Sequence, residues 1–297
     1  MDPEQVAYHV VGSSEAAAIV VSGVFFVFMV LAVVNLKVTK FRYYVVVVIA
    51  ASFRVVGFAA RAAYLSHYRP ALAGDYLAFT NAGFGANLAV LCLVLLTWCK
   101  HADMQVFRPL ERQLYPWISG LLILPILAFG PVCGIIAAGL IYGAITPGAL
   151  ASGERLRRAA SWGLLCVLIV FSTLITRVTA RVLLYKAAAA SDSKHGREQP
   201  QTMQRMRLVA VLFTCTVLLD LRACIAVAAL YHPRFVADEH LYYPLIVLPE
   251  LLVLFILTVP TLMAQVALVY PPDPQEGRSR RTKGDADRAE KGDELPS

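Results

Sequence analysis

The chain has 297 residues, of which 58% are hydrophobic and only 16% are charged, and its mean hydropathy is +0.63. A soluble domain of this length keeps its apolar residues in short pieces, whereas here they form runs of about twenty, enough to cross ~30 Å of hydrocarbon as a helix. The net charge of +7 does not indicate a nucleic-acid-binding protein, because the aromatic residues lie inside the apolar runs and not among basic residues on one surface.

Seven apolar runs follow one another along the chain and absorb nearly all of it. A bilayer requires every backbone amide to be satisfied within its own segment, so each run is predicted to be a helix. The sequence thus predicts an all-α, seven-transmembrane-helix bundle over residues 16–269, with a short terminus at 1–15, a charged tail at 270–297 and no room for a soluble catalytic domain. The runs are Ala16–Asn35, Tyr43–Leu65, Tyr76–Cys99, Trp117–Ile141, Ala159–Tyr185, Leu208–Tyr231 and Leu241–Val269.

The distribution of basic residues predicts the orientation of the bundle. Of the 27 Lys and Arg residues, 17 lie in the tail and in the connections after the first, third and fifth runs, and five lie in the terminus and the remaining connections. This bias places the N-terminus outside or in a lumen and the tail in the cytosol, where the basic charge faces anionic lipid. Arg155, Arg157 and Arg158 disagree, because they fall on the outer side.

Charged side chains inside the apolar runs are the unusual feature of this sequence. Each costs ~2.5–3.5 kcal/mol or more at the centre of a bilayer unless it is paired or hydrated. Arg61 lies near the outer end of its run, so its guanidinium is predicted to extend to the interface. Four others lie near the predicted midplane, too deep for that escape: Arg54, Asp220, Arg222 and Glu250.

Pairing between helices is the arrangement that these four positions favour. Asp220 and Arg222 are two residues apart, about 200° around a helix, so they point to opposite sides and need separate partners. Arg54 is expected to pair with Glu250 or with Asp220, which joins helices distant in sequence. Such a pair either fixes helix register or belongs to a ligand-sensing switch.

Two further features bear on this polar centre. Asn81 and Asn87 in the third run are candidates to complete the network through interhelical hydrogen bonds. Pro249 removes a helical hydrogen bond directly before Glu250 and is expected to kink the last run.

Motifs for catalysis or for known receptor classes are not found in the sequence. It has no Gly-rich phosphate loop, no His-Glu-x-x-His and no Cys/His metal spacing, so we expect no enzymatic activity and no cofactor. The chain reads "WCKHADM" after the third run and "LPELLVL" in the seventh, which are not the landmarks of the large G-protein-coupled receptor class. Cys99, at the predicted cytosolic end of its helix, is a candidate for palmitoylation.

Two polar segments are predicted to lie on the cytosolic side and to stay disordered. The connection Lys186–Arg207 is basic and interrupted by Pro200, and the tail from Pro271 alternates in charge without an apolar period. They are the longest soluble parts of the chain, so they are the expected contact sites for cytosolic proteins.

Three stretches carry a resemblance to a known family: "SFRVVGFAARAAYLSHYRPAL", "LFTCTVLLDLRACIAVAAL" and "YYPLIVLPELLVLFIL". Together with "ITRVTARVLLYK" they resemble the tobamovirus multiplication family of plant seven-helix membrane proteins and, more distantly, the orphan-receptor-like lysosomal proteins of animals. The resemblance implies a non-enzymatic protein of vacuolar or other endomembranes that binds cytosolic partners, including a small Arf-like GTPase. It also implies a structural role for Arg54.

Three functions remain open at this point. The first is a membrane anchor or scaffold that recruits cytosolic proteins through its basic loops. The second is an orphan receptor that senses a ligand through the region of Arg54, Asp220 and Glu250, with the plasma membrane as its alternative location. The third is a small-solute transporter that uses the same polar centre as its pathway.

Overall fold

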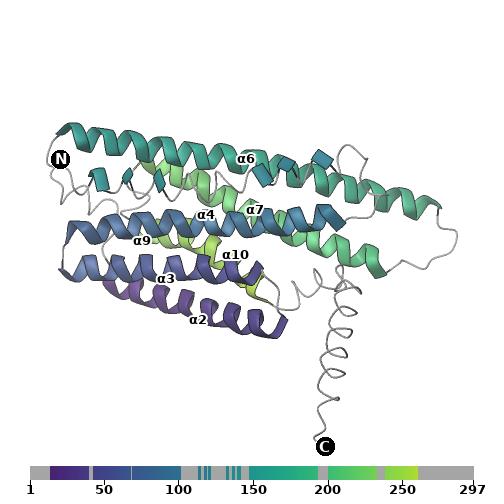
Figure 1. Ribbon diagram of the computed structural model, residues 1–297, viewed down its shortest axis with the longest axis horizontal. Helices are drawn as coiled ribbons and strands as arrows, with labels where there is room; N and C mark the ends of the chain where they lie inside the picture. Colours follow the sequence, from purple (N-terminus) through teal and green to yellow (C-terminus); the bar gives the residue numbers. More distant parts are fainter. Residues whose placement is uncertain are drawn as a thin grey trace, which may run out of the picture.

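The computed structural model describes residues 14–39, 43–67, 69–101, 147–192, 200–232 and 238–259, together with short helical stretches between 113 and 141. Regular structure in these residues is helical throughout, as the all-α prediction requires (Figure 1). Six of the described helices are long and apolar enough to cross a bilayer, and they coincide with six of the seven predicted runs. The remaining run, Trp117–Ile141, lies largely outside the described residues.

Three consecutive helices form one side of the bundle: α2 (Glu15–Thr39), α3 (Tyr43–His67) and α4 (Pro70–His101). They run antiparallel, and α3 packs against both neighbours (Figure 1). Ser14 starts α2, because its Oγ accepts a hydrogen bond from the Ala17 amide at 3.1 Å and so satisfies an otherwise free donor. Pro70 starts α4, at a position where the missing amide hydrogen costs nothing.

A long helical hairpin forms the other side: α6 (Pro147–Asp192) and α7 (Pro200–Tyr231). The 46 residues of α6 span about 69 Å, more than twice the hydrocarbon thickness. The prediction of a disordered connection over Lys186–Arg207 is therefore wrong at both ends, because α6 continues to Asp192 and α7 begins at Pro200. Both helices project as regular structure past the predicted inner face.

The last segment lies between the two sides as α9 (Glu239–Tyr242), the π-helical turn η1 (Tyr243–Val247) and α10 (Leu248–Thr258). α10 contacts α2, α3, α4 and α7, so it is the central helix of the bundle. The amide of Leu248 donates to the carbonyl of Tyr243, five residues back. This wider register directly precedes Pro249, which has no amide hydrogen and whose ring would press on the preceding turn of a regular helix.

The predicted seventh run is too long at its C-terminal end. α10 ends at Thr258, and Val259 is extended because it precedes Pro260. The Asn35 side chain donates to the Thr258 carbonyl at 2.6 Å, so a polar group of α2 satisfies the final turn of α10. Residues 260–297, including the predicted tail, lie outside the described residues.

The helices differ strongly in how much of their surface the bundle covers. In α4 78% of the most apolar stretch is buried, whereas in α2 only 17% is. The uncovered face of α2 carries large apolar side chains such as Val20, Phe26 and Val27. That distribution is expected where lipid, not protein, covers the outer helix.

Candidate functional site

The polar centre of the bundle is built around the carboxylate of Glu250 on α10. Its Oε1 atom accepts a hydrogen bond from Nη2 of Arg54 on α3, and Nε of Arg222 on α7 lies 2.7 Å from the same oxygen as an ion pair. All three side chains are at most 5% exposed. One carboxylate oxygen therefore joins three helices, and the predicted Arg54–Glu250 pair is present. We call these three residues the central cluster.

α4 forms the wall against which both guanidinium groups lie. A Cβ atom at position 83 would lie 3.0 Å from Nε and 3.2 Å from Cδ of Arg54, so the glycine there makes room for the arginine. Phe84, the next residue, holds its ring centre 4.0 Å from the guanidinium carbon of Arg222, a close cation–π contact. Sequence reasoning missed both residues, although small residues commonly mark close approaches between membrane helices.

The charges of the central cluster do not cancel. Two guanidinium groups, which stay protonated in proteins, face one carboxylate, so the cluster carries one excess positive charge when Glu250 is ionised. Within the described part of the chain, Nε of Arg54 has no hydrogen-bond partner, and Nε of Arg222 has its ion pair but not the alignment of a hydrogen bond.

Asp220 does not join this cluster. Both of its carboxylate oxygens accept from the hydroxyl of Ser172 on α6, at 2.8 and 2.7 Å, and the residue is half-buried. Asp220 and Arg222 thus have separate partners on different helices, as their spacing predicts. The alternative pair of Arg54 with Asp220 is not formed.

The two predicted asparagines are not hydrogen-bonded to the central cluster. Asn87 is fully buried, and neither of its amide atoms has a hydrogen-bond partner among the described residues. Asn81 is half-buried, and no side-chain hydrogen bond is formed by it within the same ranges. Asn87 lies one helical turn beyond Gly83 and Phe84, on the face of α4 that meets both arginines.

A second buried arginine lies two turns along α3 from the first. Arg61 is 0% exposed, so the prediction that its side chain extends to the interface is wrong. Three tyrosine rings enclose its guanidinium carbon, with ring centres at 5.6 Å (Tyr76), 4.5 Å (Tyr242) and 5.2 Å (Tyr243). The hydroxyls of Tyr76 and Tyr242 are hydrogen-bonded to each other, which fixes two walls of this tyrosine cage.

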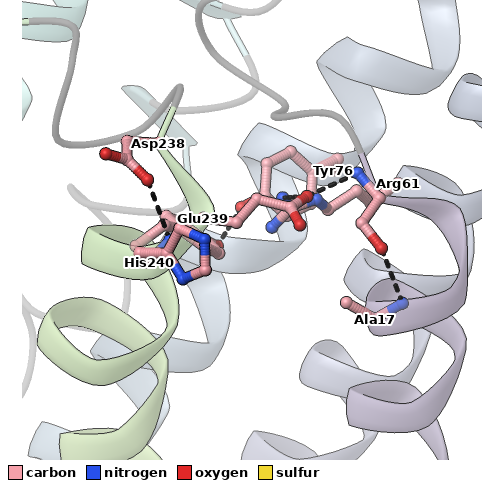
Figure 2. A network of polar contacts seen from close by, with 8 residues as sticks. Ala17, Arg61, Tyr76, Asp238, Glu239 and His240 are labelled. Carbon is pink, nitrogen blue, oxygen red and sulfur yellow. Dashed lines mark hydrogen bonds and ion pairs between the residues drawn. The ribbon is translucent and has the colours of Figure 1, made fainter.

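The first turn of α9 covers the cage at the end of the bundle (Figure 2). Glu239 places a carboxylate oxygen 3.6 Å from Nη2 of Arg61, and the same oxygen accepts from the amide of Ser14 at the start of α2. Asp238 holds the beginning of α9 by accepting from the amide of His240 at 3.0 Å. Glu239 is 22% exposed, so this ion pair lies at the edge of the bundle and not at its centre.

Cofactor and lipidation sites gain no support from the geometry. No group of three His, Cys, Asp or Glu side chains suited to a metal ion occurs among the residues that the structure places. Cys99 lies in the last turns of α4, but its side chain is outside the described part, so its palmitoylation stays a prediction.

The fold and the cluster together define a class. Six apolar helices of membrane-spanning length, with ion pairs buried between them, are the features of a polytopic helical membrane protein. No protein-family model, curated protein or solved structure matches the chain. The resemblance to the tobamovirus multiplication family therefore stays a prediction from the sequence.

Proposed function

We propose that the chain is a non-enzymatic membrane anchor that crosses the bilayer seven times and recruits cytosolic proteins at the end of the bundle where α6 and α7 meet. The observation that carries this proposal is the projection of these two helices. Ser172 and Asp220 are hydrogen-bonded near the middle of the spans, so residues 183–192 of α6 and 200–209 of α7 extend about 15 Å past the hydrocarbon.

The chemistry of the projection suits contact with proteins or with an anionic surface. Five basic residues and two acidic residues lie between 183 and 209, a net charge of +3 on two short helical segments and their connection. A basic projection that is helical gives a partner a more defined surface than a disordered loop does. In the bundle interior, the charges of the central cluster are engaged with one another, and Asp220 is engaged with Ser172.

The proposed orientation has the N-terminus outside or in a lumen. Trp162 donates to the Tyr231 hydroxyl at 3.2 Å, which places the beginning of α6 at the same end of the bundle as the end of α7. α4 ends at the other end (Figure 1), so a crossing by residues 117–141 would connect α4 to α6. Close packing at Gly153, where a Cβ would lie 2.7 Å from Ile141, supports this arrangement.

Glycosylation mapping tests the orientation. An Asn-x-Thr acceptor inserted within residues 1–13 or 233–237 is expected to be glycosylated in microsomes, and one inserted within 193–199 is not. Glycosylation of the 193–199 insertion would contradict the proposal. The three outward arginines do not exclude this orientation, because Glu154 pairs with Arg157 at 3.3 Å and with Arg158 at 3.8 Å.

Proximity labelling from the C-terminal tail of the full chain tests recruitment. Changing Lys186, Arg205 and Arg207 together to Gln is expected to remove most labelled cytosolic proteins while the protein still reaches its membrane. The matched control changes three basic residues at the opposite end of α6 (Arg155, Arg157 and Arg158) to Gln and is expected to leave the labelled set unchanged. Equal effects of both variants would contradict the proposal.

The partner and the compartment are proposed from the resemblance. A small Arf-like GTPase is the first partner to test, by binding of its GTP-loaded form to the full chain in nanodiscs with and without the three Gln substitutions. Imaging of a tagged chain is expected to mark the vacuole or another endomembrane. Labelling confined to the plasma membrane would favour the receptor instead.

A ligand-sensing receptor is the second candidate, and one observation favours it. The π-helical turn η1 and Pro249 lie directly before Glu250, and such turns are often found at functional sites. Glu250→Gln protein that folds and binds partners yet loses a ligand-dependent response would support the receptor. Solute flux in proteoliposomes that disappears in the same variant would support the transporter.

A further inference from the structure

We propose that a small monovalent anion, of the size of chloride, binds in the bundle interior between Arg54, Arg222 and Asn87. The proposal goes beyond the anchoring function and does not depend on it. It starts from charge: two buried guanidinium groups share one carboxylate, which leaves one positive charge without compensation. An uncompensated ion deep in a low-dielectric interior costs several kcal/mol, so a second negative group is expected beside the cluster.

The sequence offers no second carboxylate for this position. The seven apolar runs contain two acidic residues, Asp220 and Glu250. Both oxygens of Asp220 accept from Ser172 on the far side of α7, so that carboxylate is directed away from Arg222. Glu239 lies at the outer edge beside Arg61. Since no further carboxylate joins the cluster among the described residues, the expected source of negative charge is a counter-ion from outside the chain.

Donor groups for an anion are present and unengaged. Nε of Arg54 and Nδ2 of Asn87 are buried without a hydrogen-bond partner among the described residues, and the Asn87 oxygen, an acceptor, would face away from the anion. Arg54 Nε lies against α4 at Gly83, and Asn87 is one turn further along the same face. Side chains on a helix lean toward its N-terminus, so the Asn87 amide leans toward Gly83 and Phe84, where both guanidinium groups lie.

The size and charge of the ligand follow from these surroundings. Phe84 closes one side of the Arg222 guanidinium, and Arg54 lies so close to the Gly83 backbone that not even a Cβ atom fits between them freely, so a bulky oxyanion or a lipid headgroup is a poor fit. A monovalent ion brings the net charge of the cluster to zero, whereas a divalent ion would reverse it. Water satisfies the same donors but leaves the charge in place.

Thermal unfolding of the full chain in detergent tests the proposal directly. The unfolding midpoint is measured while sodium chloride replaces sodium gluconate at constant ionic strength. A bound anion stabilises the folded state in proportion to ln(1 + [L]/Kd), so the midpoint is expected to rise with the logarithm of the chloride concentration above Kd, by about 2–4 °C in total. Equal midpoints in chloride and gluconate would overturn the proposal and assign the donors to water.

Asn87→Asp supplies the missing negative charge within the chain. This variant is expected to unfold at a higher temperature than the unsubstituted protein in gluconate and to lose its response to chloride. The matched control is Asn81→Asp on the same helix, about 240° away around α4, which is expected to keep the full chloride response. If Asn87→Asp still responds to chloride as the control does, the anion does not bind at this cluster. If that variant does not accumulate, the titration of the unsubstituted chain decides the proposal alone.

Discussion

Two buried arginines on the same helix are stabilised in different ways. Arg54 and Arg61 are seven residues apart on α3, two turns along one face, and both are at most 1% exposed. Arg54 faces a carboxylate from α10 that is itself buried, whereas Arg61 is enclosed by three tyrosine rings with a half-buried carboxylate at 3.6 Å. Deep in the bundle a charge requires an opposite charge; nearer the end, aromatic faces and a carboxylate in contact with water are sufficient.

The largest expected effect is the difference in stability between substitutions at the two carboxylates, Glu250 and Glu239. Glu250→Gln leaves two guanidinium groups buried without a counter-charge and is expected to lower the free energy of unfolding by about 3–5 kcal/mol. Glu239→Gln makes the same chemical change at the tyrosine cage, where the carboxylate is 22% exposed and three tyrosine rings still face Arg61, and it is expected to cost about 1 kcal/mol or less. Thermal unfolding in detergent and the yield of folded protein measure both.

Binding of cytosolic partners is the control for this pair of variants. Folded Glu250→Gln protein is expected to keep the partners of the α6–α7 projection, because the substitution is far from residues 183–209. Equal destabilisation by Glu250→Gln and Glu239→Gln would show that depth does not distinguish the two sites.

A substitution on α4 tests the central cluster through its wall. Gly83→Ala places a methyl group 3.0 Å from Arg54 Nε, so the arginine side chain must shift within the packed central cluster, at an expected cost of about 1–3 kcal/mol in the free energy of unfolding. The control is Gly23→Ala on α2, which meets no atom within 4 Å and is expected to be neutral or slightly stabilising. A neutral Gly83→Ala in the same thermal-unfolding assay would mean that Arg54 has room to move without loss.

Arg61→Lys tests the tyrosine cage without removing its charge. A lysine ammonium keeps the positive charge but cannot spread over three rings as the planar guanidinium does, so we expect a loss of about 1–2 kcal/mol in the free energy of unfolding. The midpoint of thermal unfolding measures the loss. An unchanged midpoint would indicate that charge alone, and not the stacked geometry, stabilises this site.

The central cluster was accessible from the sequence because charged residues are rare in the apolar runs. With two acidic residues in seven runs, a partner for Arg54 had only two candidates, Glu250 and Asp220, and the sequence left both open. That Arg222 shares the Glu250 carboxylate could not be predicted from the sequence. The sharing depends on the rotation of α7 relative to α10, which packing with α4 sets and a single helix does not encode.

The errors have identifiable physical causes. The environment of Arg61 was misjudged because its distance from the helix end is a property of one helix, whereas Tyr76 and Tyr242 come from two others. The length of the α6–α7 connection was overestimated because an apolar run indicates which residues contact lipid, whereas a helix can continue beyond that run. The stretch "KAAAAS" has no large apolar side chain and so does not extend the apolar run, yet alanine is the strongest helix former, and α6 continues through it.

The smallest expected effect concerns a third kind of charged site, the half-buried carboxylate of Asp220 with a single hydroxyl partner. Ser172→Ala removes the hydroxyl that both oxygens of Asp220 accept from, and interhelical hydrogen bonds in membranes contribute about 0.6 kcal/mol on average and at most about 1.7. The control is Ser161→Ala on the same helix, whose hydroxyl donates only to the Arg157 carbonyl within α6, and it is expected to be neutral. Thermal unfolding of the two variants compares them. Asp220 is half-buried, so water can replace part of the lost hydrogen bond. A loss from Ser172→Ala as large as that from Glu250→Gln would contradict this and would mean that Asp220 depends on Ser172 as strongly as Arg54 and Arg222 depend on Glu250.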